Sequence, residues 1–114
     1  MIGPDPTDAQ AEALGRIVAH LITLRQLSLS VAGMLQAGRS PGLEASMVKD
    51  LGTEFDQSMP HLMRDLTDER ADRTAQSLVA RALGEAILSV PAYSIQGGTR
   101  EILRSIISKG IGLR

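Results

Sequence analysis

The chain has 114 residues and a formal net charge of −1, from 12 basic and 13 acidic side chains. This balance gives no field that would attract nucleic acid, and an aromatic content of 2% is too low for base stacking. The absence of cysteine excludes disulfides and thiolate metal sites. Neither an apolar run of about 18 residues nor a signal-peptide pattern occurs. We therefore expect a cytoplasmic protein with no membrane span and no nucleic-acid partner.

The core must be built from aliphatic side chains, because Phe55 and Tyr93 are the only aromatic residues. Such a core favours packed helices over a sheet. The length is that of one domain, residues 1–114. We predict an all-α, up-and-down four-helix bundle, with helices at approximately 8–37, 41–66, 69–89 and 99–109.

The first predicted helix begins with a capping box, since Thr7 and Gln10 have the required spacing. Gly38 is a typical C-terminal stop. Apolar residues cover a wide arc of this helix, so we expect it to pack on its own bundle and on a neighbouring subunit or domain. An exposed apolar stripe around Leu27 and Met34 is predicted to mediate association.

Three prolines are expected to affect where the next two helices begin, bend or end. Ser40 followed by Pro41 predicts the start of the second helix, with proline at its first position. Pro60 is expected to kink or end that helix. Residues 67–74 are charged and predict a loop. The third helix should stop before Pro91, because the residue preceding a proline disfavours the α region.

Several polar residues have more than one interpretation. Lys49 and Asp50 are expected to face outward from the second helix. Arg25 lies in the apolar arc of the first helix, where it could snorkel or pair with a carboxylate, or contact an interface or a cofactor phosphate. His20 is expected to be packed or hydrogen-bonded, because no acid or second histidine has metal-ligand spacing with it.

Near the C-terminus, a short extended piece is expected to lead into Gly97 and Gly98, and Thr99 to begin the last helix. Gly110 is expected to form a left-handed cap. Paired glycines before a helix let a ligand approach the backbone, and the free N–H groups favour an anion such as a cofactor phosphate. The same pattern is typical of a plain turn with an N-cap. Glu101 is the only acid nearby, and its simplest role is to complement the helix dipole.

Two segments carry a family resemblance. The segment IQGGTREILRSIISKGIGL resembles the C-terminal signature of the acyl-CoA dehydrogenase family, I-x-G-G-T-x-E-I-x-R-x-I-I-x-x-x-x-G-L. Residues 39–54, RSPGLEASMVKDLGTE, resemble a second stretch of the same domain, and the two occur in the family's order. The resemblance implies the C-terminal four-helix bundle, without the β-barrel and N-terminal helical domain of a full-length member.

Members of that family remove an α proton and a β hydride from an acyl-CoA thioester, using a carboxylate base and FAD. The position often held by the base is Gly97 here, so the resemblance implies no catalytic residue in this chain. It implies FAD contacts by Gly97, Gly98, Thr99 and Glu101, and the residue spacings predict no metal site. The glutamine-x-x-glycine-glycine segment that contacts the FAD of a neighbouring subunit is not found between residues 66 and 88.

We therefore expect the C-terminal FAD-contacting and oligomerisation domain of a flavin-dependent acyl-CoA dehydrogenase, an oxidoreductase of fatty acid metabolism. The domain is expected to be inactive alone and to share FAD with missing domains or a partner subunit. It would associate with itself or with a complementary dehydrogenase subunit, and acyl-CoA would bind only in the full assembly. The alternative is a stand-alone helical interaction module without catalysis.

Overall fold

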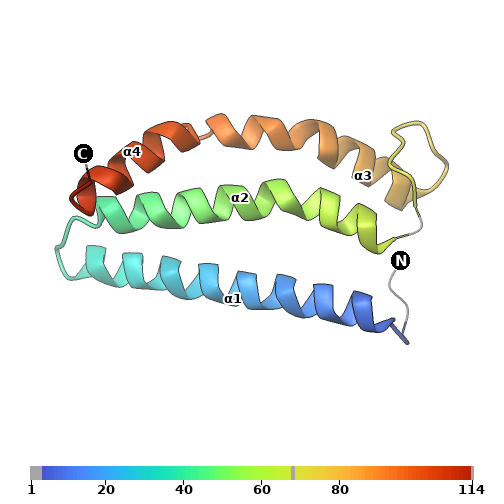
Figure 1. Ribbon diagram of the computed structural model, residues 1–114, viewed down its shortest axis with the longest axis horizontal. Helices are drawn as coiled ribbons and strands as arrows, with labels where there is room; N and C mark the ends of the chain where they lie inside the picture. The colour runs from blue at the N-terminus through green and yellow to red at the C-terminus, as the bar shows by residue number, and fades with distance from the viewer. Residues whose placement is uncertain (1–3, 68, 114) are drawn as a thin grey trace.

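The computed structural model describes residues 4–67 and 69–113, and within these residues it contains helices and no strand (Figure 1). The all-α class with four α-helices is confirmed. The elements are α1 (Asp8–Gln36), α2 (Gly42–Leu66), α3 (Leu78–Ser89), the 3-10 helix η1 (Val90–Ile95) and α4 (Arg100–Gly110).

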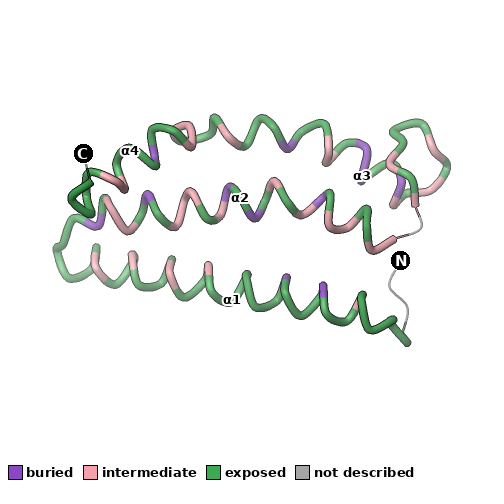
Figure 2. Tube along the Cα trace, viewed as in Figure 1, coloured by how far each residue is buried: buried purple, intermediate pink, exposed green. Residues whose placement is uncertain are grey.

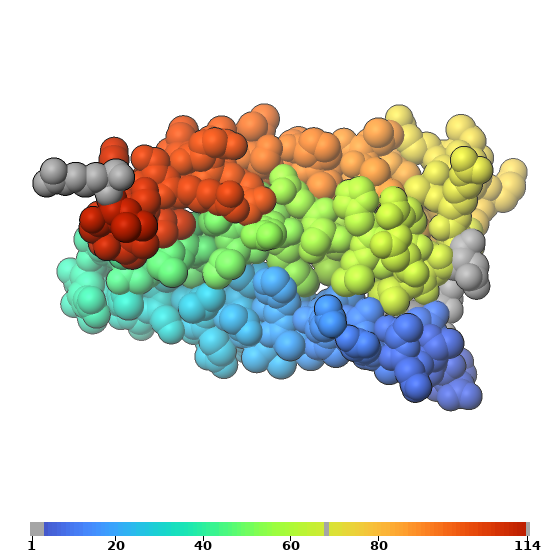
Figure 3. All heavy atoms as spheres, viewed as in Figure 1, coloured from blue at the N-terminus to red at the C-terminus, as the bar shows by residue number. Residues whose placement is uncertain are grey.

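The helices lie side by side in three rows, which are α1, α2 and the run from α3 through η1 to α4. α1 and α2 run antiparallel, while α3, η1 and α4 follow one another end to end along the other side of α2 (Figures 1 and 3). The central helix, α2, therefore packs against every other element. The molecule is elongated, at 50 × 28 × 26 Å, and its radius of gyration of 17.4 Å exceeds the value of about 13 Å expected for a compact domain of this length.

The core is thin. Among the described residues, no large side chain is less than 2% exposed. In α1 only Ala13 and Ile17 are buried, and most of that helix is exposed along its length (Figure 2). The buried hydrophobic residues follow the contacts of α2 with its neighbours: Ala13, Ile17, Phe55, Ala80, Leu83, Val90 and Leu103. Much apolar surface is left for a partner to cover.

The ends of α1 follow the sequence prediction, whereas α2 differs from it. The Thr7–Gln10 capping box is present, and Gly38 has a left-handed φ of 73°. The N-cap of α2 is Pro41, without a side-chain hydrogen bond, where Ser40 was expected. α2 also continues past Pro60 to Leu66. Pro60 is buried at the α2–α3 contact, and this packing offsets the missing backbone hydrogen bond.

The third helix begins at Leu78, later than the predicted residue 69. Ser77 is its N-cap, since the backbone N–H of Ala80 donates to Ser77 Oγ at 3.3 Å. Ser77 Oγ in turn donates to Glu69 Oε1 at 2.8 Å. The preceding loop also folds back on the helix, because the N–H of Asp72 donates to the carbonyl of Ala80 at 3.0 Å. These tertiary hydrogen bonds hold the charged segment as a loop.

Two details near the C-terminus also differ from the prediction. The expected extended piece is η1, which contains Pro91, since the fixed φ of proline suits the start of a 3-10 turn. Gly110 is the last helical residue of α4 and not a left-handed cap, whereas Gly112 has a φ of 83°. A Cβ on Gly110 would lie 2.7 Å from Leu43 Cδ1, so this glycine allows α4 to approach α2 closely.

Candidate functional site

The turn between η1 and α4 has the conformation that two glycines permit. Gly97 and Gly98 have φ values of 74° and 106°, which lie in the left-handed region that disfavours other residues. Thr99 is the N-cap of α4, as predicted, and its Oγ1 accepts from the N–H of Ile102 at 3.4 Å. The remaining N–H groups of the first helical turn have no partner within the helix.

Little packs against these glycines. A Cβ on Gly97 would meet only Lys49 Cε, at 3.6 Å, and one on Gly98 would meet only the side chain of Leu103, at 3.8 Å. The glycines are thus required for the backbone conformation and not for space. Lys49 was expected to face outward, but it is half-buried beside the turn. Among the described side chains it forms no ion pair.

A cluster of ion pairs joins α2 to the first turn of α4. Arg100 Nε donates to Asp50 Oδ1 at 3.0 Å, and Arg104 Nε lies 3.4 Å from Asp50 Oδ2. Arg100 Nη2 also donates to Glu54 Oε2 at 2.9 Å. The hydrogen bond to Asp50 is the main cause that raises the pKa of Arg100. Asp50 is only 14% exposed, so the prediction that it faces outward is wrong.

Glu101 is exposed at the same helix terminus. Its pKa is lowered, first by a hydrogen bond from its own backbone N–H and then by one from the Thr99 hydroxyl. Glu101 is therefore ionised at neutral pH, as expected of a residue that complements the positive end of a helix dipole. A general base for an α proton needs a raised pKa in a dry pocket, and Glu101 has neither.

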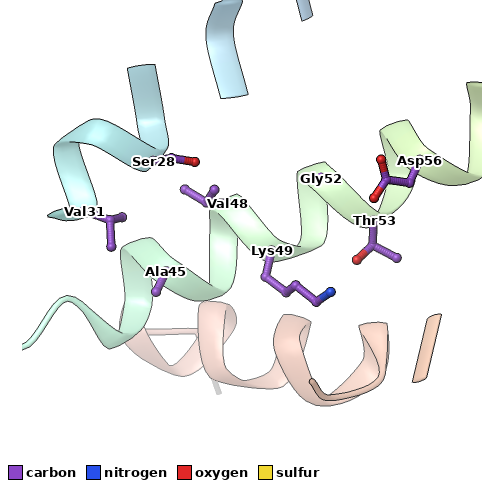
Figure 4. Close-up of a pocket in the computed structure, with 8 residues that line it drawn as sticks. All are labelled: Ser28, Val31, Ala45, Val48, Lys49, Gly52, Thr53 and Asp56. Atoms are coloured by element: carbon purple, nitrogen blue, oxygen red, sulfur yellow. The ribbon is translucent and has the colours of Figure 1, made fainter. Parts of the chain in front are cut away.

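A groove of about 370 Å³ with both apolar and polar lining residues lies between α1 and α2 (Figure 4). Lys49 borders both this groove and the glycine turn, while Thr53, 4% exposed, and Asp56 lie one and two turns further along α2. This groove was not predicted from the sequence. Its only sequence signal is the helical spacing of its polar residues. The lining residues are Ser28, Val31, Ala45, Val48, Lys49, Gly52, Thr53 and Asp56.

The exposed apolar stripe of α1 is not where it was predicted. Leu27 and Met34 are half-buried and line a groove against α2. The aliphatic side chains that are 46–60% exposed lie nearly on the opposite side of the helix: Leu14, Val18, Leu21, Ile22, Leu29 and Leu35. Arg25 lies on the same side, is exposed, and forms no ion pair among the described residues. We call this surface, with Arg25, the α1 stripe.

Among the described residues, neither histidine belongs to a cluster of metal-ligating side chains. His20 packs against Phe55, with ring centroids 4.7 Å apart and a tilt of 38°, so the prediction of a packed histidine is confirmed. Across residues 4–67 and 69–113, no group of three or more metal-ligating side chains occurs. By length and composition, α1 and the Leu78–Ile95 segment could each cross a membrane, a test that core helices of soluble proteins also pass.

The fold and the turn define a helical domain whose last helix starts directly after two glycines with positive φ and a threonine N-cap. The chain matches the family model described as acyl-CoA dehydrogenase, C-terminal domain, over residues 7–112. It therefore belongs to the acyl-CoA dehydrogenase family, whose members generally use FAD and are typically oligomeric. No curated protein and no solved structure matches the chain.

Proposed function

We propose that this domain is the FAD-contacting and oligomerisation part of a flavin-dependent acyl-CoA dehydrogenase, which acts within a larger chain or complex. The observation that carries the proposal is the turn at Gly97, Gly98 and Thr99, in a chain that matches the family over residues 7–112. The α1 stripe supports the oligomerisation part.

The residues at the turn fit one end of a dinucleotide. Gly97 and Gly98 leave the backbone open, the Thr99 hydroxyl can hydrogen-bond to a ribose, and Lys49 adds a cation beside the turn. The negative charge of the ionised Glu101 would repel a phosphate on the helix axis. Its carboxylate can instead accept a hydrogen bond from a ribose hydroxyl. These contacts would form one wall of a site, and further walls must come from other domains or subunits.

The domain contributes binding and orientation to the dehydrogenation. FAD, when bound, supplies the acceptor for the hydride that leaves the β carbon of the acyl group. The α proton needs a base, and neither Gly97 nor the ionised Glu101 provides one. We therefore expect that the isolated domain does not dehydrogenate acyl-CoA and that the carboxylate base lies elsewhere in the assembly.

Flavin retention tests the cofactor part of the proposal. The protein is incubated with FAD and desalted, and its visible flavin absorbance is measured with and without complementing dehydrogenase domains. Thr99→Val is expected to reduce retention, because it removes the hydroxyl at the turn. Thr23→Val, in which the exposed Thr23 hydroxyl bonds only to its own helix, is the matched control. A colourless protein under both conditions would contradict the FAD assignment.

The α1 stripe is proposed as the surface that associates with a second copy or a complementary subunit. Six half-exposed aliphatic side chains on one helix form the kind of patch that marks protein interfaces. Arg25 lies within the patch, so a surface that covers it must offer a carboxylate or a path to solvent. α1 is also the helix with the fewest buried residues per turn of its length.

Light scattering coupled to size-exclusion chromatography, over a range of concentrations, tests this surface. Leu21→Glu places a charge in the α1 stripe and should shift the protein toward the monomer. Thr23→Glu, on the opposite side of the same helix, should leave the mass unchanged. A monomeric wild type, alone and with dehydrogenase partners, would remove the oligomerisation assignment.

The alternative function is a helical interaction module without catalysis. It is favoured if the protein associates through the α1 stripe but retains no flavin in any assembly. We also propose that neither apolar helix spans a membrane, since Arg25 lies within the apolar part of α1, and Arg81 and Glu85 lie within the Leu78–Ile95 segment. Flotation with lipid vesicles tests this, because recovery of the protein with the vesicles would favour a membrane role for α1 instead.

A further inference from the structure

The ion pairs between α2 and α4 place arginine where a helix disfavours it. Arg100 is the first residue of α4, and the positive end of the helix dipole repels a cation there. Asp50 and Glu54, both on α2, offset this repulsion with contacts of 3.0 and 2.9 Å. Arg100 is 23% exposed and Asp50 14%, so their contact is partly shielded from water and salt.

The cluster lies next to a turn that has few other anchors. Arg100 directly follows Thr99, while Gly97 and Gly98 carry no side chains, and a Cβ added to either would meet only the side chain of Lys49 or Leu103 within 4 Å. On the η1 side, the nearest buried residue is Val90. The position of the turn is therefore set on one side by the packing of η1 on α2, and on the other side by what holds the start of α4, namely the packing of Leu103 and the contacts of Asp50.

We propose that Asp50 is a positioning residue, which holds Arg100 and Arg104 and thereby keeps the Gly97–Thr99 turn in one orientation against α2. The identity of the ligand at the turn rests on the proposed function, whereas the positioning does not. Asp50 engages two arginines with its two separate oxygens, one helical turn apart on α4. This arrangement fixes the rotation of α4 about its axis as well as its distance from α2.

The competing interpretation is that the two arginines themselves bind an anionic ligand and that Asp50 merely neutralises them. The two interpretations predict opposite effects of Asp50→Asn. If Asp50 positions the turn, the substitution loosens the turn and weakens ligand binding. If Asp50 only competes with the ligand, the substitution frees Arg104, leaves Arg100 only its contact with Glu54, and strengthens binding.

Amide hydrogen exchange tests the positioning without a ligand. Asp50→Asn should raise the exchange of the hydrogen-bonded α4 amides 102–107 by about tenfold relative to those of α1, because a charge-assisted hydrogen bond is lost. Asp56→Asn is the matched control, since Asp56 is an exposed α2 carboxylate with no ion pair among the described residues. Asp50→Glu should retain protection, and Arg100→Gln gives a second route if Asp50→Asn does not fold. Equal acceleration throughout the chain, or none at amides 102–107, would overturn the proposal.

FAD affinity, measured on the protein or its complex with complementing domains, separates this inference from the proposed function. A wild type that binds FAD and an Asp50→Asn variant that binds about tenfold more weakly would support both. Stronger binding by Asp50→Asn would overturn the positioning role and leave the FAD assignment standing. A wild type that does not bind FAD would overturn the FAD assignment, and hydrogen exchange would then decide the positioning alone.

Discussion

Replacing Gly84 by alanine probes how closely the 69–77 loop rests on α3. Gly84 is buried in the interior of α3. A Cβ at this position would lie 2.9 Å from the backbone N of Arg73 and 3.2 Å from the carbonyl carbon of Asp72. Because these are backbone atoms, the clash cannot be relieved by a side-chain rotation. Either the loop or α3 must move.

The expected size of the effect follows from two opposing terms. Alanine in a helix interior is more favourable than glycine by about 0.5–1 kcal/mol. Inserting a carbon into a filled contact costs about 1–3 kcal/mol. Gly84→Ala should therefore be destabilised by about 1 kcal/mol. In α1, the carbon added by Gly15→Ala has nothing within 4 Å, so this variant should be stabilised by about 0.5–1 kcal/mol.

The measurement is urea unfolding followed by helical circular dichroism, which gives the free energy of unfolding of each variant. The two variants carry the same chemical change, so their difference, expected to be about 2 kcal/mol, isolates the loop contact. Equal stabilisation of both variants would show that the loop does not rest on α3 in solution and would refute the reasoning.

Three further changes have defined outcomes. Thr99→Val should lower the free energy of unfolding by about 1 kcal/mol through the lost N-cap, which urea unfolding measures, and an unchanged midpoint would exclude Thr99 as the cap. Leu103→Ala, at a 6% exposed position, should lower the free energy of unfolding by about 2–5 kcal/mol in the same assay. A loss well below that range would mean that the Leu103 side chain is not buried in solution. The hydrogen bonds from the hydroxyl and N–H of Thr74 lower the pKa of Asp72, so the stability they give is present above about pH 4 and is lost as the pH falls through the folded-state pKa. Thr74→Val should flatten this acid dependence in a pH series of unfolding midpoints, and an unchanged slope would contradict it.

The sequence predicted those features that local chemistry determines. The capping box at Thr7 and the N-cap at Thr99 depend on residues within a single turn, and both are present. The left-handed Gly38 follows from the same kind of local rule. The glycine turn was also located correctly, because paired glycines before an N-cap have few alternative conformations.

Features that depend on distant partners were not predictable. Asp50 has the local pattern of a solvated residue, and only the return of α4 along α2 turns it into the centre of an ion-pair cluster. Likewise, the wide apolar arc of α1 did not reveal which part α2 would cover, so Leu27 and Met34 were assigned to the wrong surface. The late start of α3 depends on the hydrogen bond between Ser77 and Glu69 across the loop.

The dependence of α1 on a single neighbour has a further consequence. Within the part of the chain that the structure describes, α1 has extensive contacts with α2 alone, whereas α2 and α4 are joined by both packing and ion pairs. We therefore expect α1 to separate locally at a lower free energy than global unfolding requires. Because only the short 37–41 link connects it to α2, a released α1 could dock on the α2 of a second copy and exchange identical contacts between the two molecules.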